Sequence, residues 1–438
     1  MQICKMNKIG VVQATLMVCM TVMLYASADA FHRGGVGECE GCHTIHNSRG
    51  GVPDSPTGMS GNYLLKGSDQ SSVCLNCHQV SGDPGPTAYH VSTAPADMPP
   101  GTPPRQMPPG GDFGWLKKSY SWFDTLGSTT IQRSNGNSHG HNFSALDYGY
   151  DVDSDRPVAP GGNYPSSAMS CTSCHDPHGK YRRLYNGSIS TATAPIKGSG
   201  SLARSAVPDS QNAVGVYRLL GGIGYYPKSL GPGNTFSYNP PAAVAPDVYN
   251  RAESVSQTRV AYGSGMSEWC RNCHPNIHTD AVPAYLKHPS GMILGASIAG
   301  WYNQYIKDGD LLGDASIAFL SLVPFEIGST DYVNMLKPIA GTPKGPSLTD
   351  GSPQVMCLSC HRAHASGWDG AMRWNNRSPY IVFSGKYSQT GNIQPYGQGR
   401  SEIEAQAAYY YIPATAFANK QYPLCYKCHK TGTAELKK

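Results

Sequence analysis

The sequence predicts a fold made mostly of coil, with short helices and little β-structure. Of its 438 residues, 50 are Gly and 34 are Pro, and both types disfavour the interior of helices and strands. Charged residues make up only 14% of the chain, against about 25% in an ordinary globular domain. Disorder does not fit either, because 27 Tyr, 6 Trp and 14 Cys are more aromatic and apolar side chains than a solvated, disordered chain contains. Something other than regular secondary structure must therefore organise the chain.

The N-terminus has the pattern of a secretory signal peptide, which we expect to span residues 1–30. Lys5 and Lys8 make a basic start, a mostly apolar run follows, and Ala28-Asp29-Ala30 supplies a small-residue cleavage site. No later stretch is apolar enough to span a bilayer. We therefore expect residues 31–438 to be exported as a single domain with no transmembrane segment.

Twelve cysteines remain after the signal peptide, and all belong to six C-x-x-C pairs that are each followed by histidine. The pairs are Cys39 and Cys42, Cys74 and Cys77, Cys171 and Cys174, Cys270 and Cys273, Cys357 and Cys360, and Cys425 and Cys428, followed by His43, His78, His175, His274, His361 and His429. This is the attachment motif of c-type haem. Two thiols at this spacing reach the two vinyl groups of a porphyrin, and the next residue turns its imidazole onto the iron. We therefore expect six covalent haem c groups.

Two other interpretations use the same cysteines. They could form six disulfides, as in a disulfide-stapled adhesin, or zinc sites, because C-x-x-C is half of a zinc site. Neither explains the histidine after every pair. With 15 His in the chain, six such coincidences have a chance on the order of one in a billion.

Haem also explains the composition, and the predicted fold class is a multihaem cytochrome c wrapped around a chain of haems. Six haems replace the peptide core, so loops rich in Gly and Pro can enclose them. The motifs are 35, 97, 99, 87 and 68 residues apart, which is too irregular for a solenoid. We expect extended surface loops at residues 95–111, 186–214 and 221–247.

Two stretches are predicted to be helical. Residues 311–322 have apolar side chains at roughly helical spacing. Ser401 and Glu404 form a capping-box pattern before residues 405–411, and Pro413 ends that segment.

Nine further histidines could fill the second axial position of the irons. We expect bis-His ligation rather than Met ligation, with the distal ligands drawn from His46, His90, His141, His178, His278, His288 and His364. His139 lies two residues before His141, and we expect one of the two to be spare; His32 is the weakest candidate.

Four of these histidines follow a motif closely. His46, His178 and His364 come three residues after the motif histidine, and His278 comes four after. Such a residue lies one helical turn away, on the same face as the motif histidine. It cannot reach the far side of its own haem, so we expect it to ligate a neighbouring one.

An iron with both axial positions filled by protein has no open site for a substrate, so electron transfer is the first functional hypothesis. The alternatives are a multihaem reductase with one open haem, and an electron shuttle of the periplasm or cell surface that does not polymerise. No Ser/His/Asp set, phosphate loop or carboxylate pair stands out. The net charge of +5 is modest and unclustered, which does not indicate nucleic-acid binding.

Long sequence words add a resemblance to a known family. The words GGVGECEGCHTIHNS, ADMPPGTPPRQMPPGGDFGW and RVAYGSGMSEWCRNCHPNIH resemble the OmcS-like hexahaem outer-surface cytochromes of metal-reducing bacteria, and the similarity covers residues 31–430. The resemblance implies bis-His haems in one continuous chain and head-to-tail filaments at the cell surface. It implies electron delivery to Fe(III) oxides, electrodes or partner cells, with other outer-surface cytochromes as partners. It also implies that His46 ligates the haem of His361 in the next protomer.

Overall fold

The structure is a computed structural model, and it describes residues 39–44, 48–49, 52–53, 64–123, 128–192, 194–246, 252–253, 260–277, 290–304, 323–337, 346, 352–389, 396–417 and 419–428. The expected signal peptide and the helix predicted at residues 311–322 lie outside these residues. So do five of the histidines singled out above, His32, His46, His278, His288 and His429.

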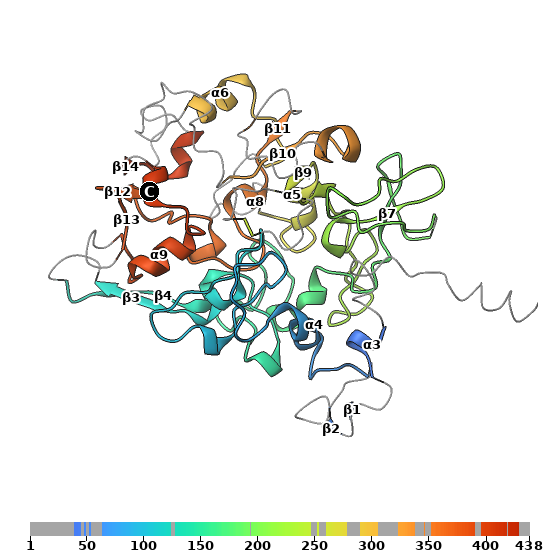
Figure 1. The fold of residues 1–438 in the computed structure, drawn as a ribbon, viewed down its shortest axis with the longest axis horizontal. Helices are drawn as coiled ribbons and strands as arrows, with labels where there is room; N and C mark the ends of the chain where they lie inside the picture. Colours follow the sequence, from blue (N-terminus) through green and yellow to red (C-terminus); the bar gives the residue numbers. More distant parts are fainter. Residues whose placement is uncertain are drawn as a thin grey trace, which may run out of the picture.

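Short helices are scattered among long loops in the described chain (Figure 1). The α-helices are α3 (Cys39–Cys42), α4 (Gln70–His78), α5 (Met266–Cys270), α6 (Ala296–Gln304), α8 (Cys357–Cys360) and α9 (Glu402–Ala408). Turns of 3-10 helix are η2 (Pro95–Asp97), η3 (Phe113–Lys117), η4 (Gly136–His139), η5 (Leu146–Tyr148), η6 (Ser166–Ala168), η7 (Cys171–Ser173), η8 (Tyr217–Leu219), η11 (Asp369–Ala371), η12 (Ala414–Ala416) and η13 (Leu424–Lys427). A π-helical turn, η9, spans Tyr332–Leu336.

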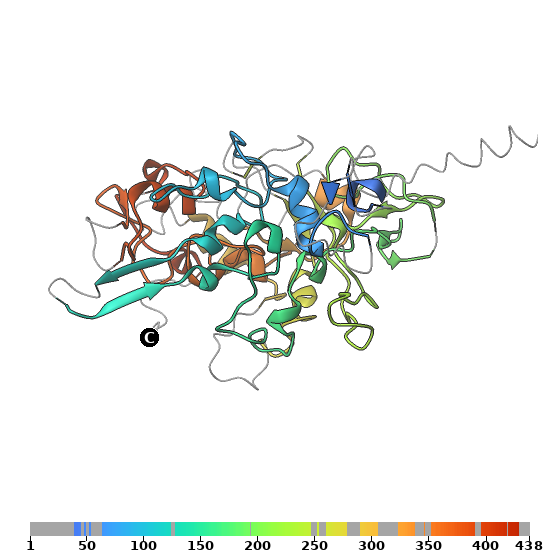
Figure 2. The same ribbon diagram turned by 90° about the horizontal axis from the view of Figure 1, so that it is seen from below.

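The strands pair in small separate sheets rather than in one layer. The sheets are β1 (Ser48–Arg49) with β2 (Val52–Pro53); β3 (Tyr120–Phe123) with β4 (Ile131–Ser134); β6 (Ile189–Ser190), β5 (Arg182–Arg183) and β7 (Val214–Gly215); β11 (Pro353–Gln354), β10 (Glu326–Ile327), β9 (Ala261–Gly263) and β8 (Ala243–Val244); and β13 (Lys386–Tyr387), β12 (Val382–Phe383) and β14 (Lys420–Gln421). The β3–β4 hairpin projects from one end of the molecule (Figure 2). The predicted fold class, mostly coil with short helices and little β-structure, is confirmed.

Helix α9 forms where the capping box predicts it, but it ends earlier than expected. The Ser401 Oγ accepts from the Glu404 backbone N–H, and the Glu404 carboxylate accepts from the Ser401 backbone N–H at 3.0 Å. The helix stops at Ala408 because Tyr410 and Tyr411 adopt left-handed φ angles of 55° and 53°. The Tyr410 hydroxyl donates to the Pro108 carbonyl at 2.6 Å, which fixes this turn against the body.

The loop at residues 95–111 is irregular, as predicted, yet it does not lie wholly on the surface. Gln106 and Met107 are buried. The fully buried carboxylate of Asp112 accepts from the backbone N–H groups of Thr93, Gln106 and Gly114 at 2.7 to 2.9 Å. A polar side chain thus supplies the hydrogen bonds that secondary structure would otherwise provide. Burial raises the pKa of Asp112 to about 6.

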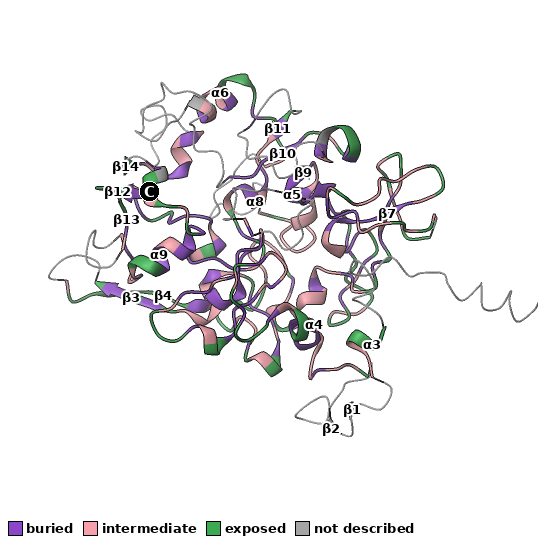
Figure 3. Ribbon diagram, in the orientation of Figure 1, coloured by how far each residue is buried: buried purple, intermediate pink, exposed green. Residues whose placement is uncertain are grey.

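The core is built largely from aromatic side chains. Trp115, Phe143, Trp368 and Tyr409 are almost completely buried in one cluster. Arg400 lies in the same core with its guanidinium 4.3 Å from the Tyr120 ring centre and 4.5 Å from that of Trp368. Buried segments run through the interior of the ribbon while exposed residues lie on outer loops (Figure 3). The interior also surrounds a large cavity.

Candidate haem-binding cavity

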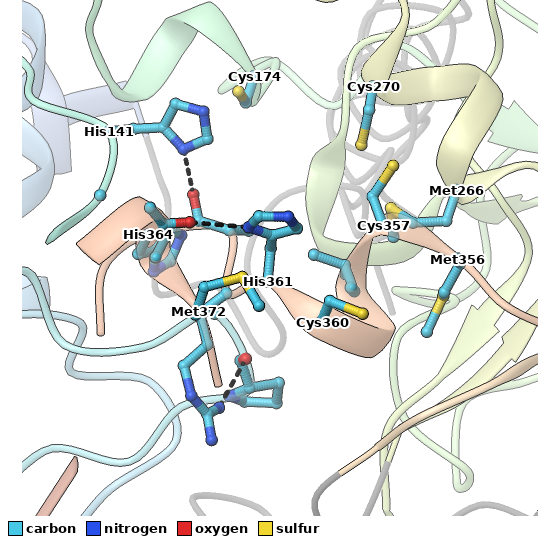
Figure 4. A pocket seen from close by; sticks show the side chains of 18 of the residues that line it. His141, Cys174, Met266, Cys270, Met356, Cys357, Cys360, His361, His364 and Met372 are labelled. Carbon is cyan, nitrogen blue, oxygen red and sulfur yellow. Dashed lines mark hydrogen bonds between the residues drawn. The ribbon is translucent and has the colours of Figure 1, made fainter. Parts of the chain in front are cut away.

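A single cavity of about 2350 Å³ runs through the protein. Single-ligand pockets have about 300–1,000 Å³, so this cavity is large enough for several ligands. Five of the six motifs contribute side chains to its wall, through Cys74, Cys77, His78, Cys171, Cys174, His175, Cys270, Cys273, His274, Cys357, Cys360, His361, Cys425 and Cys428. Figure 4 shows part of this wall, with Cys270 beside Cys357 and with His141, His361 and His364 gathered nearby.

Each motif forms about one helical turn. In the first, third, fourth and fifth motifs the backbone N–H of the histidine donates to the carbonyl of the first cysteine at 2.9 to 3.1 Å. The second motif forms the end of α4, whose N-cap Asp69 accepts from Ser71 and Ser72. Positions i, i+3 and i+4 of a helical turn share one face. Both thiols and the imidazole of a motif are therefore presented on the same side.

The motifs follow one another in space in the order of the sequence. The thiol of Cys74 lies close to that of Cys171, and the thiol of Cys270 lies close to that of Cys357. Cys42 lies near Cys77, Cys174 near Cys273, and Cys360 near Cys425 and Cys428, close enough for each neighbour to raise the thiol pKa in addition to burial. The six motifs thus form one continuous row.

Two of the junctions between neighbouring motifs are built in the same way. Between the second and third motifs the Cys171 N–H donates to Ser71 Oγ at 3.1 Å. Between the fourth and fifth motifs the Cys357 N–H donates to Ser267 Oγ at 3.2 Å. Ser71 and Ser267 each stand three residues before the first cysteine of their motif. The sequence analysis missed both serines, although the shared S-x-x-C pattern was a visible signal.

Each of the six histidines on the described cavity wall is oriented by a backbone carbonyl. The Nδ1 atoms of His78, His141, His175, His274, His361 and His364 lie 2.7 to 3.2 Å from the carbonyl oxygens of Tyr89, Ala363, Arg218, Pro160, Gly370 and Gly111. A carbonyl oxygen only accepts, so each Nδ1 carries the proton and Nε2 carries the lone pair that a metal requires. Burial lowers the pKa of His141 to about 4 and that of His364 to about 3, which keeps both rings neutral.

Three pairs of imidazoles face each other at a spacing that would hold an iron between them. The ring centres are 6.4 Å apart for His43 and His178, with planes 9° from parallel. They are 6.1 Å apart for His141 and His274, and 6.5 Å for His175 and His364. An iron–nitrogen bond of about 2 Å, plus about 1.1 Å from nitrogen to ring centre on each side, requires about 6 Å. The residues present therefore fit bis-His haem.

His90 lies in the segment that runs beside His78. The Val91 N–H donates to the His78 carbonyl at 2.9 Å. The His90 ring is buried, its Nδ1 hydrogen-bonds the Asp83 carboxylate, and its Nε2 has no hydrogen-bond partner. A buried nitrogen in this state is costly unless it binds something.

The sequence predicts that either His139 or His141 is not a haem ligand. The surroundings of His139 differ from those of His141. His139 is fully buried. Its Nδ1 lies 2.9 Å from the Trp115 carbonyl, and its Nε2 lies 2.8 Å from Ser134 Oγ and 3.3 Å from Arg400 Nη2. Both ring nitrogens are therefore used by the protein itself.

The described cysteines are not paired with one another. None of the twelve is in a disulfide. In the part of the chain that the structure describes, no three Cys, His, Asp or Glu side chains converge as a metal ion bound only by protein would require. Within the same residues, no helix has the length and apolar character needed to cross a membrane.

Comparisons with known proteins identify the family of the chain. No family model matches the chain. The C-type cytochrome OmcS of Geobacter sulfurreducens (strain ATCC 51573 / DSM 12127 / PCA) is 52% identical over 421 residues, covering 93% of this chain and 96% of that protein. Two solved structures, from cryo-EM of OmcS nanowires and of the outer membrane cytochrome S filament of G. sulfurreducens, align with TM-scores of 0.82 and 0.80 at 51% and 50% identity. Each covers 91% of this chain and 99% of the other. The chain belongs to the OmcS family of C-type cytochromes.

Proposed function

We propose that this protein carries electrons outside the cell through six covalently bound haem c groups, each with two histidine ligands. The observation that carries the proposal is the set of three facing imidazole pairs, 6.1 to 6.5 Å apart, beside cysteine pairs on the wall of one cavity. Bound haem iron supplies a reversible one-electron change. The protein's part is to hold the irons in a row and to deny other molecules access to them.

The three imidazole pairs suggest which histidine serves which iron: we assign His178 to the haem of His43, His364 to that of His175, and His141 to that of His274. We assign His90 to the haem of His78 on other grounds, because its segment runs beside His78 and its buried Nε2 has no hydrogen-bond partner. The sixth haem, on Cys425, Cys428 and His429, then takes His278 or His288.

The fifth haem, held by Cys357, Cys360 and His361, is left for His46 of the partner subunit. His361 is exposed, and no described imidazole stacks on it. On our assignment, the histidine after the third motif serves the first haem, and the histidine after the fifth motif serves the third. The same step of two motifs, continued into the next subunit, brings the histidine after its first motif to the fifth haem.

We infer from these ligands that the protein is an electron-transfer protein and not an enzyme. A reductase needs an iron with an open position, whereas the proposed ligands fill all twelve axial positions of each subunit in the filament. The similarity to OmcS nanowires supports a head-to-tail filament at the cell surface, reached by export of residues 31–438. The proposed acceptors are Fe(III) oxides, electrodes, partner cells and other outer-surface cytochromes. The alternative is an electron shuttle that does not polymerise.

Two measurements on the exported protein test the proposal. A pyridine haemochrome assay should count six haems per chain, and EPR of the oxidised filament should show low-spin iron only. A substantial high-spin fraction in intact filaments would favour the reductase. Electron microscopy of the haem-containing fraction decides between filament and shuttle, because a shuttle would give single particles only.

A further inference from the structure

One candidate distal ligand differs from the other oriented histidines in its second partner. In the described residues, the cavity histidines with a hydrogen-bonded Nδ1 bond to a neutral backbone carbonyl. The Nδ1 of His90 instead bonds a carboxylate, Asp83 Oδ2. The two side chains are only 6% and 8% exposed, so water screens this contact weakly.

The carboxylate is held in place by a built network. Asp83 Oδ1 accepts from the Gly85 N–H at 2.8 Å, and Oδ2 accepts from Gln106 Nε2 at 3.0 Å. Gln106 Oε1 in turn accepts from the N–H and the hydroxyl of Thr87 at 2.9 and 2.8 Å. The hydroxyl oxygen of Thr87 accepts from the His90 N–H at 3.1 Å. The network therefore fixes both the aspartate and the ring it contacts.

A carboxylate draws the Nδ1 proton more strongly than a carbonyl does. The ring then gains negative character, and its Nε2 becomes a stronger electron donor to a metal. A stronger donor stabilises the more positive ferric state over the ferrous state. Burial, then His90, then Arg218 lower the pKa of His78. The positive charge of Arg218 acts on the potential of this haem in the opposite direction to Asp83. Arg218 also lies beside His175, so it does not single out the second haem.

We propose that Asp83 tunes the second haem, lowering its reduction potential through His90. This rests on the proposed function, in which His90 is a ligand of the haem bound to Cys74, Cys77 and His78. Asp83 acts as a positioning residue, since it contacts the ligand and not the iron. The second haem then stays ferric at lower potentials than it would with a neutral carbonyl on the Nδ1 of His90.

The test is Asp83→Asn in the full-length haem protein, with Asp97→Asn as the matched control. Asparagine keeps the size of the side chain, and its one oxygen can take the place of Oδ2 and still accept from His90 and Gln106, while the Gly85 N–H loses its side-chain acceptor. Asp97, at the end of η2, pairs with Arg105 at 3.5 Å and accepts from the Gly82 N–H at 2.8 Å, so its variant also removes a negative charge nearby without touching His90. Potentiometric titration followed at the haem absorbance band is the measurement.

In Asp83→Asn, one-sixth of the absorbance change should move to higher potential, with the ferrous-to-ferric ratio of that haem raised about tenfold at fixed potential, or about 59 mV. Gln106→Leu removes the amide that shares Asp83 Oδ2, and should move the same fraction the other way. No shift in Asp83→Asn, or an equal shift in Asp97→Asn, would overturn the proposal. The ligand assignment is tested separately, because His90→Ala must convert one haem to high spin if His90 is a ligand.

Discussion

His139 and His141 are two residues apart, and the structure predicts opposite consequences of removing their rings. His139→Ala should leave all six haems low-spin but destabilise the protein. The Trp115 carbonyl, the Ser134 hydroxyl and Arg400 would each lose one buried hydrogen bond but keep another partner. At about 0.5–1.5 kcal/mol for each of these three bonds, the free energy of unfolding should fall by about 1.5–4.5 kcal/mol.

His139→Ala should also remove a pH dependence. Burial, followed by the nearby Arg400, lowers the pKa of His139 to about 4 from an ordinary value of 6.5. The unfolded chain therefore binds a proton that the folded protein does not, and stability is lost as the pH falls from about 6.5 to 4. This costs on the order of 3 kcal/mol at the acid end. In the variant, the free energy of unfolding should therefore fall less steeply between pH 6.5 and 4.

The matched variant is His141→Ala. Its ring faces His274 across 6.1 Å, so the loss should convert one haem in six to high spin. Low-temperature EPR counts high-spin iron, and thermal melts between pH 4 and 8 follow stability. New high-spin iron in His139→Ala, or none in His141→Ala, would show that the roles of the two histidines have been exchanged.

Three other predictions address the junctions, a buried acid and the filament. Ser71→Ala and Ser267→Ala should each lower the free energy of unfolding by about 1 kcal/mol while leaving six haems bound; haem loss in either would contradict a purely structural junction. Burial raises the pKa of Glu326 to about 8 from 4.5, so the folded state holds an extra proton and stability should fall as the pH rises from about 4.5 to 8. Glu326→Gln should abolish that fall in thermal melts, and an unchanged pH profile would refute the cause. His46→Ala should retain six covalent haems, make the fifth high-spin and abolish filaments in micrographs; six low-spin haems in verified wild-type monomers would refute ligation between subunits.

The sequence alone specifies what local chemistry determines. The six motifs are local because two thiols and one imidazole must share a helical turn, and the capping box of Ser401 and Glu404 is local for the same reason. The end of α9 was not predictable, because Tyr410 is pulled into a left-handed turn by Pro108, which is distant in sequence. The burial of Gln106 likewise depends on Asp112, whose carboxylate accepts from the Gln106 N–H. The sequence around Asp112 does not show that this carboxylate is buried rather than exposed to water.

The choice between His139 and His141 was also beyond the sequence. The two differ in what surrounds their nitrogens, namely Ser134 and Arg400 for one ring and the cavity for the other. Asp83 was missed because an aspartate seven residues before a histidine has no recognisable spacing. It becomes meaningful only when the chain between them turns back and joins the carboxylate to His90.

The alternation of motifs suggests why such a chain would polymerise. The odd-numbered motifs share the pattern C-x-x-C-H-x-x-H, and His178 and His364 each face a motif histidine two places earlier in the row. On the proposed assignment, that rule leaves the first such histidine, His46, with no haem to serve in its own chain, and it leaves the fifth haem one ligand short. A head-to-tail contact satisfies both, and a contact between two different surfaces repeats without closing unless its rotation forms a ring. Ligation and filament growth would then have one cause, the step of two motifs along a row of six.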